Sequence, residues 1–144
     1  MSDPGAAAVR REVASPLVAP VTAEATGPGR ATSRFPLDPA EPLLAGHYPG
    51  FPIFPGVCLV ECAHRTSLGA VDGGGGPVRL AEVESARFLG PVFPGDTVHT
   101  ETVATAVDGG WRCQARLAAE GPDGSGRERR QVAVVRLRYA AGAA

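Results

Sequence analysis

The stretch GVCLVECAHRTSLGAV, residues 56–71, decides the fold. It is the only convincing helix in the sequence, because Pro55 stands at its start, where a missing N–H costs nothing, and a run of glycines at 73–76 ends it. The segment is apolar nearly all round, and its strongest polar exceptions are Glu61, His64 and Arg65. A helix of this kind is normally buried, so we expect it at the centre of the fold.

The segments on both sides of this helix have the composition of β-strands. Four follow it, separated by turn sequences such as DGG and GPDGSG, at 77–89, 97–107, 111–120 and 128–139. Two short strands are expected before it, near 12–25 and 30–37, and the proline-punctuated segment 38–55 is expected to be a loop. The pattern predicts an α+β domain in which a curved antiparallel sheet wraps around a long central helix.

Length and composition fit one domain of a globular protein. The chain has 144 residues, of which 44% are hydrophobic and 20% charged, enough for a single core. We expect a flexible tail over 1–9 and one domain over 10–140. The net charge of −1 argues against a nucleic-acid binder. No apolar run is long enough to cross a membrane and no signal peptide is evident, so a cytoplasmic location is the default expectation.

The segment GHYPGFPIFPGVCLVECAHR, residues 46–65, carries the residues suited to chemistry. His47 lies in a rigid loop, and histidine has a proton affinity suited to acid–base catalysis near neutral pH. Glu61 lies within the apolar helix, where a carboxyl group favours its protonated form and can serve as a general acid. The amides of Gly56 and Val57 lie at the helix start, where they can donate to a carbonyl oxygen.

These three features suit the removal of water from a 3-hydroxyacyl thioester. The reaction needs a base for the α-proton, donors for the thioester oxygen and an acid for the departing hydroxyl. The residues themselves leave plainer interpretations open. His47 could cap a turn, and Glu61 could pair with Arg65 or with a basic group across a dimer. Cys58, Cys62 and His64 have the spacing C-x-x-x-C-x-H, for which core packing is a better interpretation than a metal site.

The motif GHYPGFPIFPGVCLVE resembles the signature of the FabZ-type 3-hydroxyacyl-(acyl carrier protein) dehydratases, GHFPG-x-P-[IV]-x-PGV-x-x-[VLI]E. A second block, ESARFLGPVFPGD at 84–96, resembles that family's later segment ARF-x-x-PV-x-PGD. The resemblance implies a hotdog fold and an assembly of dimers or trimers of dimers. It places the active site between subunits, with His47 of one chain as the catalytic histidine and Glu61 of the other as the catalytic acid.

The same resemblance implies the remaining parts of the site. The Gly56 amide would bind the carbonyl, and the residues assigned to substrate binding are Phe54, Pro55, Gly56, Val57 and Arg65. No metal or organic cofactor is expected, because the substrate arrives on the phosphopantetheine arm of acyl carrier protein. The expected products are enoyl thioesters for fatty acid, polyketide or polyene biosynthesis. Neither nucleic acid nor a membrane is an expected partner.

The sequence departs from the family pattern at two places. The amino-terminal motif HRYPFLLVD has no counterpart before Arg34, which leaves the acyl chain length undetermined. Arg65 replaces a glutamine that commonly follows the glutamate, and we expect its side chain to point at the partner or the carrier. The group Arg127, Arg129 and Arg130 could receive an acidic carrier, but a solvated hairpin end explains it equally well.

Two other functions remain as alternatives. A hotdog thioesterase shares the fold but would release a free acid. A non-catalytic subunit would pair with an active paralogue in a heterodimer, which fits Arg65 and the unusual amino terminus. A MaoC-type hydratase is disfavoured because the aspartate-x4-histidine spacing of that group is not found.

Overall fold

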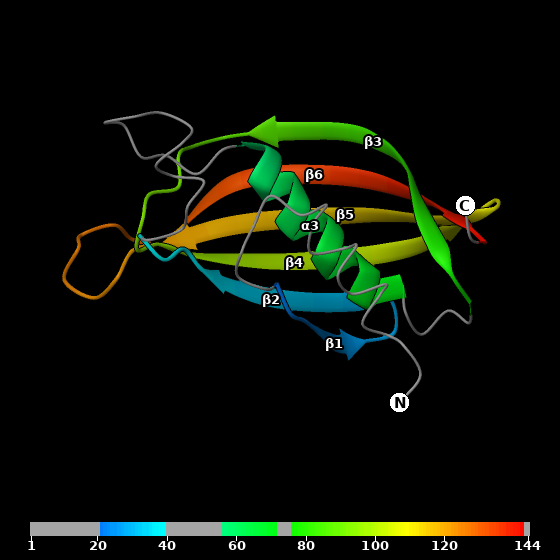
Figure 1. Cartoon of the computed structure of the whole chain (residues 1–144), viewed down its shortest axis with the longest axis horizontal. Helices are drawn as coiled ribbons and strands as arrows, with labels where there is room; N and C mark the ends of the chain where they lie inside the picture. The colour runs from blue at the N-terminus through cyan, green and yellow to red at the C-terminus, as the bar shows by residue number, and fades with distance from the viewer. Residues whose placement is uncertain (1–20, 40–55, 72–75, 143–144) are drawn as a thin grey trace.

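The computed structural model describes residues 21–39, 56–71 and 76–142 (Figure 1). These ranges contain one helix and six strands, in the order β1 (Ala23–Gly27), β2 (Arg30–Pro36), α3 (Gly56–Val71), β3 (Val78–Phe88), β4 (Thr97–Val107), β5 (Gly110–Glu120) and β6 (Arg130–Ala141). No helix in these ranges is both long and apolar enough to cross a membrane.

The six strands form one antiparallel sheet in the order β1-β2-β4-β5-β6-β3. The sheet curves around α3, which lies across one of its faces (Figure 1). The α+β architecture predicted from the sequence is therefore confirmed. The β1–β2 hairpin turns at Pro28-Gly29, where Gly29 has φ +68° and a Cβ would lie 2.8 Å from the Ala104 carbonyl oxygen. Only glycine fits this turn without strain.

The helix and the strand 97–107 have the predicted bounds, but the first strand differs. The first strand was predicted near 12–25, of which residues 12–20 lie outside the described residues, and β1 begins at Ala23 and runs on to Gly27. The prediction ended too early because the turn, and not the earlier prolines, limits this strand. The strand that follows the helix, β3, pairs with β6 at the edge of the sheet, a neighbour that the sequence pattern did not specify.

One face of α3 packs into the core between helix and sheet. Cys58, Leu59, Cys62 and Ala63 are buried there against side chains from the inner faces of the strands, including Phe35, Val98, Leu117, Leu137 and Tyr139. The prediction that Cys58 and Cys62 are core residues is confirmed. The expectation that the whole helix is buried is wrong for the single chain, because the opposite face of α3 is open. This face carries Val57, which is 65% exposed, and the half-buried residues Val60, Glu61, His64, Arg65 and Leu68.

Candidate functional site

The start of α3 lies directly against the end of β3. An ideal Cβ on Gly56 would lie 2.9 Å from Cζ of the Phe88 ring, so the ring sits where any larger residue would place its side chain. The first amides of a helix lack partners within the helix, and the helix dipole adds partial positive charge there. Phe88 and Val57 are 51% and 65% exposed. The helix start thus offers amide donors beside an exposed aromatic ring.

Glu61 and Arg65 form an ion pair on the open face of α3. The Arg65 Nε–H donates to Glu61 Oε2 at 2.6 Å, and the two side chains are 23% and 21% exposed. The expectation that Arg65 points at a partner or carrier is therefore wrong for this chain, because residues four apart on a helix are neighbours and the guanidinium reaches the carboxylate.

His64 lies beside this pair and anchors the helix to the sheet. Its Nδ1 is 2.7 Å from the hydroxyl of Tyr139 on β6, and the two rings stack with centroids 5.7 Å apart. The Tyr139 hydroxyl also donates to the His64 carbonyl oxygen at 3.3 Å. Burial lowers the pKa of His64 from its usual value of 6.5, and it raises the pKa of Tyr139. Both groups are therefore held in their neutral forms near pH 7.

This burial makes the stability of the fold sensitive to mild acid. Because the pKa of His64 is lower in the folded than in the unfolded chain, its contribution is complete above about pH 6.5 and is lost as pH falls toward the folded pKa. We expect up to ~1.4 kcal/mol of unfolding free energy to be lost per pH unit in that interval. This loss of unfolding free energy is measured by denaturant unfolding at pH 7.0 and at pH 5.5. His64→Gln removes the titration, so equal pH slopes for this variant and the wild type would contradict the assignment.

Hydroxyl groups line part of the interface between α3 and the sheet. The Ser33 and Thr66 hydroxyls lie 2.7 Å apart, and Thr66 also donates to the Cys62 carbonyl oxygen at 2.7 Å. Ser67 and Thr102 form a second pair at 2.9 Å. These hydrogen bonds fix the position of α3 on the sheet, because each buried hydroxyl would otherwise lose its partner.

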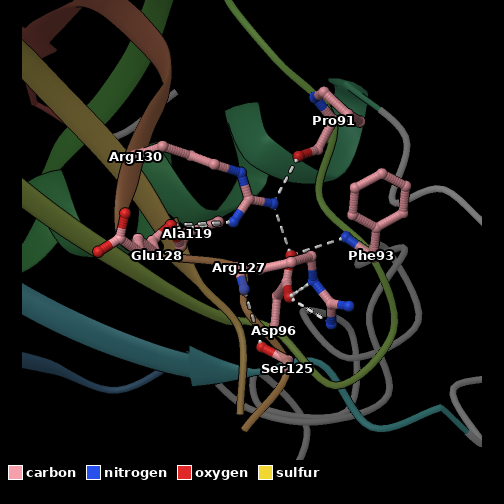
Figure 2. A network of polar contacts seen from close by, with 8 residues as sticks. All are labelled: Pro91, Phe93, Asp96, Ala119, Ser125, Arg127, Glu128 and Arg130. Carbon is pink, nitrogen blue, oxygen red and sulfur yellow. Dashed lines mark hydrogen bonds and ion pairs between the residues drawn. The ribbon is translucent and has the colours of Figure 1, made fainter. Parts of the chain in front are cut away.

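A buried carboxylate ties the loop after β3 to the hairpin between β5 and β6 (Figure 2). Asp96 is fully buried and accepts hydrogen bonds from the Phe93 amide at 3.0 Å, Arg127 Nε at 2.9 Å and Arg130 Nη2 at 2.8 Å. Burial opposes its ionisation, but the bonds from Phe93, Arg130 and Arg127 outweigh burial and lower its pKa. Arg130 also donates to the Pro91 carbonyl oxygen at 3.0 Å. Two of the three arginines considered as a carrier surface thus serve this internal site.

The predicted site residues divide into those the structure describes and those it does not. His47, Phe54 and Pro55 lie outside the described residues, so their catalytic and binding roles stay predictions. Gly56, Val57, Glu61 and Arg65 lie along α3, and in the described ranges no cluster of side chains suits a metal ion. The network around Asp96 was not predicted from the sequence. Its only signal was the PGD turn of the second motif, which specifies no partner.

A comparison with protein families matches residues 23–120, well over half of the chain, to the model described as ApeI-like, ApeI dehydratase. The chain belongs to the ApeI-like dehydratase family. The match runs from β1 through β5 and includes α3 with Glu61. The predicted relationship to the FabZ-type dehydratases is confirmed by curated relatives.

One such relative is the 3-hydroxyacyl-[acyl-carrier-protein] dehydratase FabZ of Thermus thermophilus, which is 46% identical over 66 residues, covering 42% of this chain and 46% of the relative. The FabZ of Rhizobium rhizogenes is 41% identical over 85 residues, covering 54% of each chain. The ApeI-like chain thus spans about half the length of the curated relatives it matches.

Solved structures share the fold at low sequence identity. The structure described as the dehydratase heterocomplex ApeI:P from Xenorhabdus doucetiae matches with a TM-score of 0.65 and 17% identity, over 83% of this chain and 94% of that chain. An acyl-CoA hydrolase mutant from Staphylococcus aureus matches with a TM-score of 0.62 and 17% identity, over 82% and 69%. With the curved sheet around α3, these likenesses confirm the predicted hotdog fold.

Proposed function

We propose that this protein removes water from 3-hydroxyacyl thioesters carried on acyl carrier protein, giving enoyl thioesters. The observation that carries the proposal is the position of Glu61, a carboxyl group on the open face of α3 five residues after the amide donors at Gly56. Membership of the ApeI-like dehydratase family and the local likeness to FabZ dehydratases support it.

Three groups of the protein take part in the proposed reaction. The Gly56 amide donates to the thioester oxygen and stabilises the negative charge that develops when the α-proton leaves. His47 takes that proton as general base. The bond between Cβ and the hydroxyl oxygen then breaks, a proton from Glu61 reaches the oxygen, and water departs as the Cα–Cβ double bond forms. His47 becomes protonated and Glu61 becomes a carboxylate, so a proton passes between them before the next turnover. No step calls for a metal or organic cofactor.

A second copy or a related chain would complete this site. Strand β3 ends the sheet of described strands and presents exposed apolar side chains at Leu80, Val83 and Phe88. An exposed edge of this kind can pair with another chain. The open face of α3 adds Val57 and the Glu61–Arg65 pair to the uncovered surface. We propose a dimer in which His47 of one chain faces Glu61 of the other.

Product analysis tests the proposed reaction. Purified protein is incubated with a panel of 3-hydroxyacyl carrier thioesters of different chain lengths, and the carrier is analysed by intact mass. Dehydration lowers the carrier mass by one water and leaves the thioester intact. Recovery of unacylated carrier with free 3-hydroxy acid would instead support a thioesterase and reject dehydration.

Arg65 is expected to limit the activity because its ion pair with Glu61 must break before the carboxyl group can turn to the substrate. Arg65→Gln removes the charge and keeps a hydrogen-bonding group, so we expect kcat/KM at pH 7 to rise about two- to fivefold, the size of a partly exposed ion pair. Arg65→Lys keeps the charge and should change little. A loss of a hundredfold or more in Arg65→Gln would mean that the guanidinium itself takes part in the reaction.

A heterodimer with a paralogous subunit is the second candidate assembly, and the neighbouring structure described as a dehydratase heterocomplex favours it. In that assembly this chain contributes Glu61, and a partner contributes the facing groups. Activity of the purified chain alone would favour the homodimer. Activity that appears only after addition of a second hotdog chain would favour the heterodimer.

A further inference from the structure

The face of the sheet that points away from α3 carries an open groove of about 860 Å³. Its walls come from β1, β2, β4, β5 and β6, and the residues that bear on its function are Arg30, Glu101, Arg112, Gln114, Arg116 and Arg136. The strand register places Gln114 opposite Arg136, Glu101 opposite Arg116, and Arg30 beside Val103. Adjacent strands in a sheet lie ~5 Å apart, so these side chains share one continuous surface. We call this surface the arginine groove.

The arginine groove has an excess of positive charge. Four arginines line it against one carboxylate, Glu101, although the chain as a whole has a net charge of −1. Arg112 is already bound, because its Nε and Nη2 donate to Glu84 at 2.8 and 3.0 Å. Arg30, Arg116 and Arg136 form no ion pair with any other residue in the described ranges. Three guanidinium groups are therefore available to an incoming anion.

The charge selects the kind of partner. Two copies of this face would repel each other, because each would present unpaired arginines, so the groove does not suit a second copy of the chain. An open groove that crosses neighbouring strands suits the broad surface of a protein better than an enclosed small molecule. Arginine binds carboxylates through two parallel hydrogen bonds. The matching partner is a protein surface rich in aspartate and glutamate.

We propose that the arginine groove is the docking surface for the acidic acyl carrier protein, an inference that rests on the proposed function. The hairpin arginines are poor competitors for this role, because Arg127 and Arg130 are held by the buried Asp96. Docking through Arg30, Arg116 and Arg136 raises the local concentration of the carrier and speeds its encounter with the enzyme. In this proposal the groove binds the carrier protein itself and not the acyl group that the carrier holds.

The test compares two double variants with equal changes in charge. Arg116→Glu/Arg136→Glu reverses two charges in the arginine groove. Arg34→Glu/Arg79→Glu is the control and reverses two exposed arginines that do not line the groove. Binding of labelled acyl carrier protein is measured by fluorescence anisotropy at two salt concentrations. Turnover is measured with one 3-hydroxyacyl group presented on the carrier and on N-acetylcysteamine.

We expect the groove variant to raise the Kd for carrier at least about tenfold and the control about twofold or less, with both effects smaller at high salt. KM for the carrier substrate should rise in parallel, with turnover of the N-acetylcysteamine substrate unchanged. Wild-type carrier affinity in the groove variant, or an equal loss in the control, would overturn the proposal. If the charge reversals do not fold, Arg116→Gln/Arg136→Gln gives the same test with a smaller expected change.

Carrier binding and substrate turnover, measured separately, distinguish a failure of this proposal from a failure of the proposed function. Wild-type protein that binds carrier through the groove but dehydrates neither substrate supports the docking surface and rejects the reaction. Protein that dehydrates both substrates, with carrier binding unaffected by the groove variant, supports the reaction and rejects the docking surface.

Discussion

Glu61→Gln is expected to lower kcat for dehydration by about 10²–10⁴-fold, the usual contribution of a general acid or base. The amide has nearly the shape of the carboxyl group and keeps an oxygen that can accept from Arg65, but it has no acidic proton to deliver. His47→Ala should cause a loss of similar size by removing the base. KM should change little in Glu61→Gln, because the proposed role is confined to the transition state.

Steady-state kinetics with a 3-hydroxyacyl carrier thioester measures this effect, and thermal unfolding of each variant checks that the fold is kept. Glu24→Gln is a matched control, since it makes the same chemical change at an exposed position on β1. Wild-type turnover in both Glu61→Gln and His47→Ala would reject the assigned mechanism.

Asp96→Ala is expected to cost about 3–5 kcal/mol of unfolding free energy, the range for breaking a buried ion pair by removing one partner. The substitution leaves Arg127, Arg130 and the Phe93 amide without their acceptor. It also frees the loop between β3 and β4 from the β5–β6 hairpin. Such a loss is a large fraction of the ~5–15 kcal/mol typical of a domain.

Chemical denaturation measures this loss, and a surface ion pair supplies the control. Glu84→Ala removes the carboxylate that binds Arg112 on the exposed side of the sheet, where only a small change is expected. Because the pKa of Asp96 is lowered by folding, its contribution is complete above its ordinary value near 3.8 and is lost as pH falls through the folded pKa. Equal effects of Asp96→Ala and Glu84→Ala would contradict a structural role for the buried network.

The sequence predicted α3 and β4 to the residue because their ends carry strong local signals. In the sequence, Pro55 directly precedes the first helical residue, Gly56, and turn residues flank β4. The order of the strands was not predictable in the same way. Alternation of apolar and polar residues assigns faces but not neighbours, and most of β3 is exposed in the single chain, so nothing local specified its pairing with β6.

The parts of the candidate site also differ in how far the sequence could predict them. The ion pair between Arg65 and Glu61 was foreseeable because residues four apart on a helix are adjacent, although the orientation expected for Arg65 was wrong. The bonds from Asp96 to Arg127 and Arg130 span 31 and 34 residues, and no periodic pattern relates them. The arginine groove likewise depends on the strand order, which brings together residues of five strands.

The most direct test of the central claim is the fate of labelled oxygen. The protein is incubated with an enoyl thioester on acyl carrier protein in oxygen-18-labelled water, and the products of the reverse reaction are analysed by mass spectrometry. A dehydratase running backwards adds the label to the hydroxyl at Cβ while the thioester stays intact, and this is the predicted result. Label found only in the carboxyl group of a released acid would contradict the account and identify a thioesterase.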